Sequence, residues 1–254
     1  MNKISWIIGG SSGIGAALAL ELTKNGESVC ISSSSLNSLE QKANEISKLT
    51  GKQIHYIKAD VSSYQQLSQA AEEINEKYKR IDRVIFMAGI YEPMETDQMD
   101  PSLTAKIIEV NLTGAFNTVN CVLSIIKRQG FGQIAICASL SGYIGLPNSQ
   151  PYASTKAALI NLAETLRIDL INKVDIKLIN PGFVSTRLTD KNSFAMPGLM
   201  TPKEAAILIG RGLNSGKFEI HFPKKLSLIL KAISLLPYSI SSTFLRILNS
   251  TKGI

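Results

Sequence analysis

Short apolar runs of strand-forming residues alternate with longer helical patterns along most of this 254-residue chain. The strand candidates are residues 4–9, 28–33, 53–59, 82–87, 132–138, 175–180 and 217–222. The helix candidates lie near residues 13–25, 36–50, 64–79, 102–129 (two helices), 150–172 and 202–215. Strands that are separated by helices pair in parallel. The order therefore predicts an α/β fold, in which a doubly wound parallel β-sheet carries helices on both faces.

The length and composition fit one domain of this kind followed by a tail. Hydrophobic residues make up 44% of the chain and charged residues 19%, which is too apolar for a disordered protein. No linker, repeat or shift in composition marks a boundary before about residue 216. We therefore expect a single domain over residues 1–222 and a basic, apolar extension over residues 223–254.

The cysteines and the N-terminal residues indicate the cellular compartment in which the protein is expected. Cys30, Cys121 and Cys137 show no metal-type spacing, and no ligand motif surrounds either of the two histidines, so we expect no metal and a reducing, cytoplasmic environment. The first apolar run enters a glycine turn too early to be a secretory signal peptide. No stretch reaches the roughly 18 uninterrupted apolar residues of a membrane-spanning helix.

The first strand candidate runs directly into a glycine-rich turn. The turn contains Gly9, Ser11, Ser12, Gly13, Ile14 and Gly15, and a helical pattern follows it. Glycines in this position permit a tight turn and let the backbone approach a pyrophosphate, which the N-terminus of the helix then binds. The spacing is G-x-x-x-G-x-G, and a turn that is only a connection remains the alternative.

The end of the second strand candidate bears on the choice of nucleotide. An acidic residue there would favour NAD and an arginine would favour NADP, but the chain has Ser33 and Ser34. Because serines can hydrogen-bond a phosphate and nothing there repels one, NADP is preferred to NAD. Asp60, at the end of the third strand, either contacts the adenine or caps the next helix together with Ser62 or Ser63.

Tyr152 and Lys156 stand four residues apart in a helical pattern, so their side chains lie on one face of the helix. An ammonium group lowers the pKa of a nearby phenol, which is near 10 when unperturbed. The pair predicts an acid/base site. Such a spacing also arises by chance in a chain with seven tyrosines, so the interpretation depends on the surrounding residues.

Six segments resemble, in order, those of the short-chain dehydrogenase/reductase family over about residues 4–222. They are the turn Ile8–Gly15 (TGxxxGIG in the family), Phe86–Gly89 (NNAG), Asn111, Ser139, Tyr152–Lys156 (YxxxK) and Pro181-Gly182 with Thr186 (PGxxxT). The chain departs from the family pattern at Ile8, which replaces a threonine, and at Phe86 and Met87, which replace two asparagines. Ala138 stands where the family often has a serine.

The resemblance implies a Rossmann fold and an oxidoreductase that transfers a hydride between NADP or NAD and a ketone or secondary alcohol. It makes Tyr152 the general acid/base, Lys156 the residue that lowers its pKa and binds the ribose, Ser139 the residue that orients the substrate oxygen, and Asn111 part of a proton relay. It also places further residues at the cofactor: Val61, Ala88, Gly89, Pro181, Gly182, Val184 and Thr186. A non-catalytic NAD(P)-binding sensor or scaffold is the alternative, against which the intact catalytic residues argue.

The basic charge of the chain is concentrated in its tail. The net charge is +7, and residues 217–254 hold six basic side chains against the single acid Glu219. Residues 223–249 are richly apolar, and Pro237 divides them into two segments. A basic amphipathic helix of this kind lies in a membrane interface, at the inner face of a membrane, or packs over the substrate cleft or a subunit interface.

Either placement of the tail favours a lipophilic, lipid-like carbonyl or alcohol substrate. No nucleic-acid partner is expected, because the tail lacks aromatic stacking platforms. The family resemblance implies a homodimer or homotetramer through helices near residues 112–128 and 152–170. A loop over residues 183–200 is interpreted as a lid or as a plain surface loop.

Overall fold

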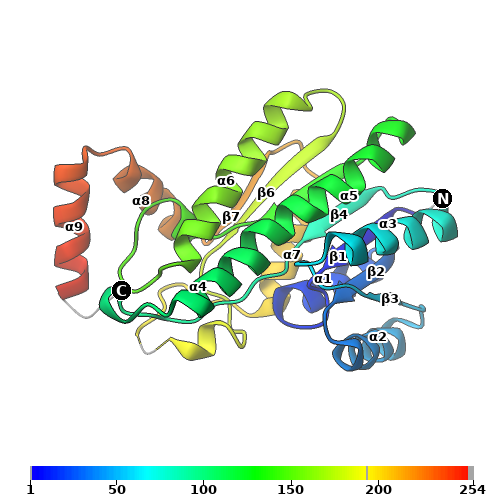
Figure 1. The fold of residues 1–254 in the computed structure, drawn as a ribbon, viewed down its shortest axis with the longest axis horizontal. Helices are drawn as coiled ribbons and strands as arrows, with labels where there is room; N and C mark the ends of the chain where they lie inside the picture. The colour runs from blue at the N-terminus through cyan, green and yellow to red at the C-terminus, as the bar shows by residue number, and fades with distance from the viewer. Residues whose placement is uncertain (1, 193, 251–254) are drawn as a thin grey trace.

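The computed structural model describes residues 2–192 and 194–250, and the strands within them form one parallel sheet of order β3-β2-β1-β4-β5-β6-β7 (Figure 1). The strands are β1 (Ile4–Ile8), β2 (Ser28–Ser33), β3 (His55–Lys58), β4 (Arg83–Phe86), β5 (Gln133–Cys137), β6 (Asp175–Pro181) and β7 (Glu219–Phe222). Each lies within two residues of its sequence-based bounds. The predicted doubly wound α/β fold is confirmed.

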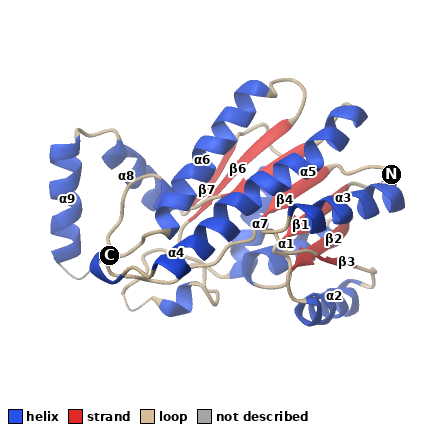
Figure 2. Cartoon of the chain, viewed as in Figure 1, coloured by secondary structure: helices blue, strands red, loops and turns tan. Residues whose placement is uncertain are grey.

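Helices cover the sheet on both faces (Figure 2). They are α1 (Gly13–Lys24), α2 (Leu36–Thr50), α3 (Tyr64–Tyr78), α4 (Pro101–Ile108), α5 (Gly114–Gln129), α6 (Tyr152–Asp169), α7 (Pro202–Leu213), α8 (Lys224–Ser234) and α9 (Tyr238–Ser250). Successive side chains of a strand point to opposite faces, so Ile7 of β1 packs with α1, α2 and α7, whereas Trp6 and Ile8 pack with α3, α5 and α6.

The sheet has a topological switch point between β1 and β4. From β1 the chain builds outward through β2 and β3, and it then returns to place β4 on the other side of β1. The loops that leave the carboxyl ends of β1 and β4 therefore diverge and leave a crevice, which is where ligands bind in sheets of this type.

Two local signals in the sequence have different outcomes. The helix predicted from residue 202 begins at Pro202 after a capping box, in which Thr201 and Glu204 each cap the other's backbone N–H. The region expected to hold two helices, residues 102–129, contains α4 and α5, but a π-helical turn over Glu109–Thr113 joins them. A π-helical turn holds one more residue than an α-helical turn, and the sequence analysis did not anticipate it.

The extension after β7 forms α8 and α9, separated at Pro237 as expected. In Figure 1 both helices lie at the end of the molecule away from the N-terminus, and α9 stands outside the helical layers that cover the sheet. Among the described residues, none of the helices is long and apolar enough to cross a membrane.

Candidate active site

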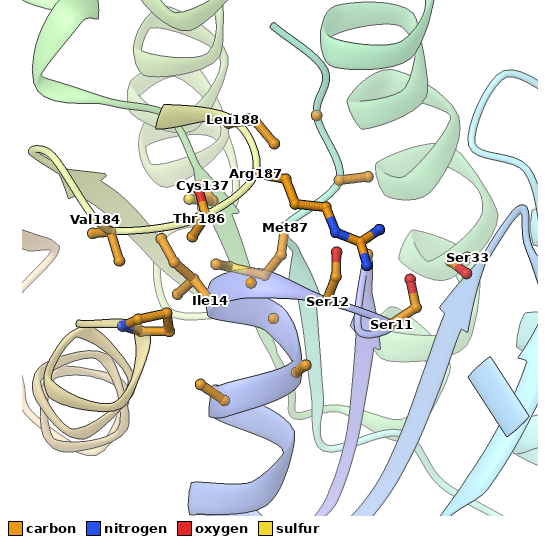
Figure 3. A pocket seen from close by; sticks show the side chains of 18 of the residues that line it. Ser11, Ser12, Ile14, Ser33, Met87, Cys137, Val184, Thr186, Arg187 and Leu188 are labelled. Carbon is orange, nitrogen blue, oxygen red and sulfur yellow. The ribbon is translucent and has the colours of Figure 1, made fainter. Parts of the chain in front are cut away.

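A pocket of about 1010 Å³ opens at the carboxyl edge of the sheet, over the switch point (Figure 3). Apart from Asn111, each residue that the sequence assigned to cofactor binding or catalysis lines this pocket. Residues from the beginning, the middle and the end of the domain therefore meet in one place. Within residues 2–192 and 194–250, no group of three or more His, Cys, Asp and Glu side chains is arranged to hold a metal ion.

The glycine turn allows two segments of backbone to touch. Gly9 has φ of +89°, and a Cβ on it would lie 2.6 Å from the backbone nitrogen of Ala88. A Cβ on Gly15 would lie 2.2 Å from the carbonyl oxygen of Gly9. Ser12 is the N-cap of α1 and makes no side-chain capping hydrogen bond, so the first N–H groups of α1 remain available to an anion in the pocket.

The ends of β2 and β3 form the part of the pocket assigned to adenosine. Ser33, Ser34 and Asp60 line it. Asp60 also accepts hydrogen bonds from the backbone nitrogen of Ser62 at 2.9 Å and from its hydroxyl at 2.6 Å, and these bonds lower the pKa of Asp60. The cap of α3 is Ser63. Asp60 therefore braces the turn before α3 and also lines the pocket, and its contact to the adenine stays a prediction.

Tyr152 and Lys156 occupy the first two turns of α6. The Nζ atom of Lys156 lies 5.3 Å from the centroid of the Tyr152 ring and donates a hydrogen bond to the carbonyl oxygen of Cys137 at 3.0 Å. Ser139 follows β5, and its hydroxyl accepts from the backbone nitrogen of Ser141 at 3.2 Å. The segment after Ser139 packs tightly on α6, because a Cβ on Gly142 would lie 2.7 Å from the carbonyl carbon of Lys156.

The expected lowering of the Tyr152 pKa is wrong for the protein alone. Burial raises the pKa of the phenol, while hydrogen bonding to Ser139 lowers it in part. Burial also lowers the pKa of the Lys156 ammonium. The physical reason is that both groups are desolvated, and the described residues place no carboxylate in an ion pair with Lys156.

Asn111 lies behind the pocket, in the π-helical turn, and is completely buried. Its Oδ1 atom accepts from the backbone nitrogen of Ile90 at 2.7 Å, and its Nδ2 atom donates to the carbonyl oxygen of Ile90 at 2.9 Å and to Thr155 Oγ1 at 3.3 Å. Asn111 therefore fixes the backbone after Gly89, which lines the pocket, and ties it to α6.

Sequence reasoning missed the cations of the pocket. Its lining includes Lys42, Lys106, Arg187 and Lys203. Figure 3 shows the Arg187 side chain extending from the loop after β6 toward Ser11 and Ser12. The position of Arg187, directly after the PGxxxT match, was the signal available in the sequence. The path of the loop over the glycine turn, which sets the position of the Arg187 side chain, has no recognisable pattern in the sequence.

Tyr91 was missed as well. Its ring centroid lies 5.1 Å from that of Tyr152, edge to face, and its hydroxyl donates to Asn192 Oδ1 at 3.1 Å. Phe183 and Phe194 form a second edge-to-face pair in the loop after β6, with centroids 5.8 Å apart. Aromatic rings therefore stand beside Tyr152 and in the neighbouring loop.

A helix N-terminus open to an anion, beside a half-buried tyrosine and serine and a buried lysine at the switch point of a parallel sheet, defines an NAD(P)-dependent oxidoreductase. The chain belongs to the short-chain dehydrogenase family, since the profile described as short chain dehydrogenase matches residues 3–196.

Individual relatives agree with this assignment. An uncharacterized oxidoreductase of Myxococcus xanthus is 30% identical over 236 residues, which cover 92% of this chain and 93% of that protein. A 3-oxoacyl-(acyl-carrier-protein) reductase of Thermotoga maritima is 30% identical over 191 residues, covering 75% of this chain and 77% of the relative. The structure of an alcohol dehydrogenase from Thermococcus sibiricus, complexed with 5-hydroxy-NADP, has a TM-score of 0.80 at 26% identity and covers 87% of this chain and 96% of its own.

Proposed function

We propose that this protein catalyses hydride transfer between NADP(H) and a ketone or secondary alcohol. The observation that supports this most is the convergence of Ser139, Tyr152 and Lys156 with the glycine turn in one pocket. The nicotinamide, when bound, supplies the hydride. The residues of the chain supply orientation and the proton.

Tyr152 is the proton donor. Its pKa is raised by burial, which keeps the phenol protonated at neutral pH and able to donate to a ketone oxygen. Lys156 stabilises the phenolate that remains and holds the ribose hydroxyls. Ser139 donates to the substrate oxygen as charge develops on it. Asn111 acts from behind, by fixing the backbone at Ile90 and anchoring the proton relay that restores Tyr152.

Three features favour NADP over NAD. No carboxylate follows β2 to repel a 2′-phosphate, since the residues there are Ser33 and Ser34. Lys42 of α2, which pairs with Glu45, also lines the pocket. The Thermococcus relative is itself complexed with a modified NADP.

We further propose a lipophilic substrate, because the aromatic side chains of Tyr91, Phe183 and Phe194 lie beside Tyr152 and in the loop after β6. We propose a cytoplasmic protein that forms a homodimer or homotetramer through α5 and α6, where Phe116 and Ile168 are exposed. We also propose that the extension over residues 223–249 contacts a membrane.

Replacement of Tyr152 by phenylalanine tests the reaction. We expect Tyr152→Phe to bind NADPH as tightly as the wild type in a fluorescence titration, while its turnover on a panel of ketones graded in chain length falls at least about 100-fold. The matched control is Tyr91→Phe, which removes a hydroxyl from the neighbouring ring and should keep most of the turnover. Wild-type turnover in Tyr152→Phe would refute the proposed role.

A further inference from the structure

Helix α8 has an apolar face where a surface helix should be polar. Ser227, Leu230 and Ile233 recur every three residues and are buried against the body of the protein. The opposite face carries Leu228, with 58% of its surface exposed, together with Ile229 and Ala232, and it leads to Leu235 and Leu236 just after the helix, of which Leu235 is 86% exposed. Because one side of α8 already packs on the domain, this second stripe is not explained by the fold.

The stripe continues past the end of α8. Tyr238, at the start of α9, is 93% exposed, and Ile240 is 54% exposed. Leu235, Leu236, Tyr238 and Ile240 together form the corner between the two helices, which lies at the extremity of the molecule in Figure 1. Tyrosine at the edge of an exposed apolar patch is typical of proteins that enter the interface of a lipid bilayer.

Cations stand at one end of the stripe. Lys224 and Lys225 form the first turn of α8 and are exposed on the same face as Leu228. Cations at a helix N-terminus oppose the helix dipole, so they do not stabilise α8. Lys217 and Lys231 lie close enough to lower the pKa of Lys224 further, after the effect of its partial burial, while Glu219 raises it. Lys224 and Lys225 leave the base of α8 positive.

We infer that α8 and the α8–α9 corner form a docking surface for an anionic lipid bilayer, with the apolar stripe in the acyl boundary and the lysines at the head groups. Charge decides between this partner and a second copy of the chain, because residues 223–254 contain no acidic side chain that a second copy could offer to the lysines. An acidic phospholipid surface complements both the cations and the stripe. The inference rests on the membrane contact proposed above, and not on the reaction.

The docking surface lies next to the pocket. Pro223, directly before α8, is held between two glycines of the loop after β6, since a Cβ on Gly182 or on Gly198 would lie 2.8 Å from its ring. Lys231 of α8 pairs with Glu219, which accepts from Tyr143, four residues after Ser139. A bilayer bound to α8 would therefore lie at the edge of the sheet where the pocket opens, and a lipophilic substrate could enter from it.

The test is co-sedimentation of the full chain with vesicles of phosphatidylcholine and with an equal mixture of phosphatidylcholine and phosphatidylserine. We expect binding to the mixed vesicles that weakens as salt is added. Lys224→Gln/Lys225→Gln should weaken it roughly 30-fold, since each cation at a membrane surface is worth about 1 kcal/mol. Leu228→Ser/Leu235→Ser should weaken it at least about tenfold.

Matched controls remove equivalent groups elsewhere. Leu36→Ser/Leu49→Ser alters two exposed leucines of α2, and Lys127→Gln/Arg128→Gln alters two adjacent exposed cations of α5. Both controls should bind vesicles as the wild type does, and all four variants should keep NADPH affinity. No binding to mixed vesicles at low salt would overturn the inference, and so would equal losses in the controls. A dimer that Leu228→Ser/Leu235→Ser converts to a monomer would show that a second copy covers the stripe instead, and would also overturn it.

Discussion

Replacement of Arg83 should show how much a buried ion pair contributes to the free energy of unfolding, at the edge of the sheet opposite the pocket. Arg83 of β4 is 2% exposed, and its Nη1 atom lies 2.8 Å from Glu27 Oε1. Its Nε atom donates to Gln133 of β5 at 2.6 Å, and its Nη2 atom donates to Asn214 after α7 at 3.0 Å. Arg83→Met leaves the Glu27 carboxylate buried without a cation, which costs about 3–5 kcal/mol of the free energy of unfolding.

Thermal unfolding followed by circular dichroism measures this cost. At about 2–4 °C for each kcal/mol, the Tm of Arg83→Met should fall by roughly 6–20 °C. The double variant Arg83→Met/Glu27→Leu removes both charges and should recover most of the loss. The control Lys191→Met breaks an exposed pair with Glu92 and should cost about 0–1 kcal/mol. The reasoning is refuted if Arg83→Met costs no more than the control, or if the double variant is no more stable than Arg83→Met.

Two further predictions concern the pocket. Arg187→Gln should weaken the binding of NADPH and of NADH alike, by roughly tenfold or more, if the guanidinium contacts the pyrophosphate. Lys42→Gln should weaken the binding of NADPH alone. Fluorescence titration of each variant with both cofactors distinguishes the two roles, and unchanged affinities would contradict both. Lys156→Met should be inactive but gain stability relative to the wild type as pH falls. Burial lowers the Lys156 pKa below its ordinary 10.5, so the unfolded wild-type chain binds a proton that the folded chain disfavours. The gain in Tm should be largest below the folded pKa and vanish toward pH 10.5; a gain that does not change with pH would contradict this.

Much of the fold follows from signals that are local in sequence. Each strand is a short apolar run between turn residues, and each central helix has an apolar face, so type and order were predictable before any contact was known. The carboxyl ends of parallel strands meet at one edge. This is why residues as distant as Gly9, Tyr152 and Thr186, which the sequence assigned to one site, line a single pocket.

The remaining features depend on the course of loops and on the surroundings of buried groups, and neither produces a periodic pattern in the sequence. The π-helical turn around Asn111, and the course of the loop that carries Arg187, are set by packing against distant segments. The pKa of Tyr152 depends on how much water its neighbours exclude, which spacing alone does not report. The exposed apolar stripe of α8 is similar: the sequence showed that the tail is apolar, but only the fold shows which face of α8 is already buried.

The most direct measurement for the central claim follows the hydride itself. NADPH that carries deuterium at the transferred position of the nicotinamide is incubated with the ketone panel, and the alcohol products are examined by mass spectrometry. The account predicts deuterium on the carbinol carbon with the wild type and with Tyr91→Phe, and none above background with Tyr152→Phe. Equal deuterium transfer by Tyr152→Phe, or none by the wild type with any ketone of the panel, would contradict it.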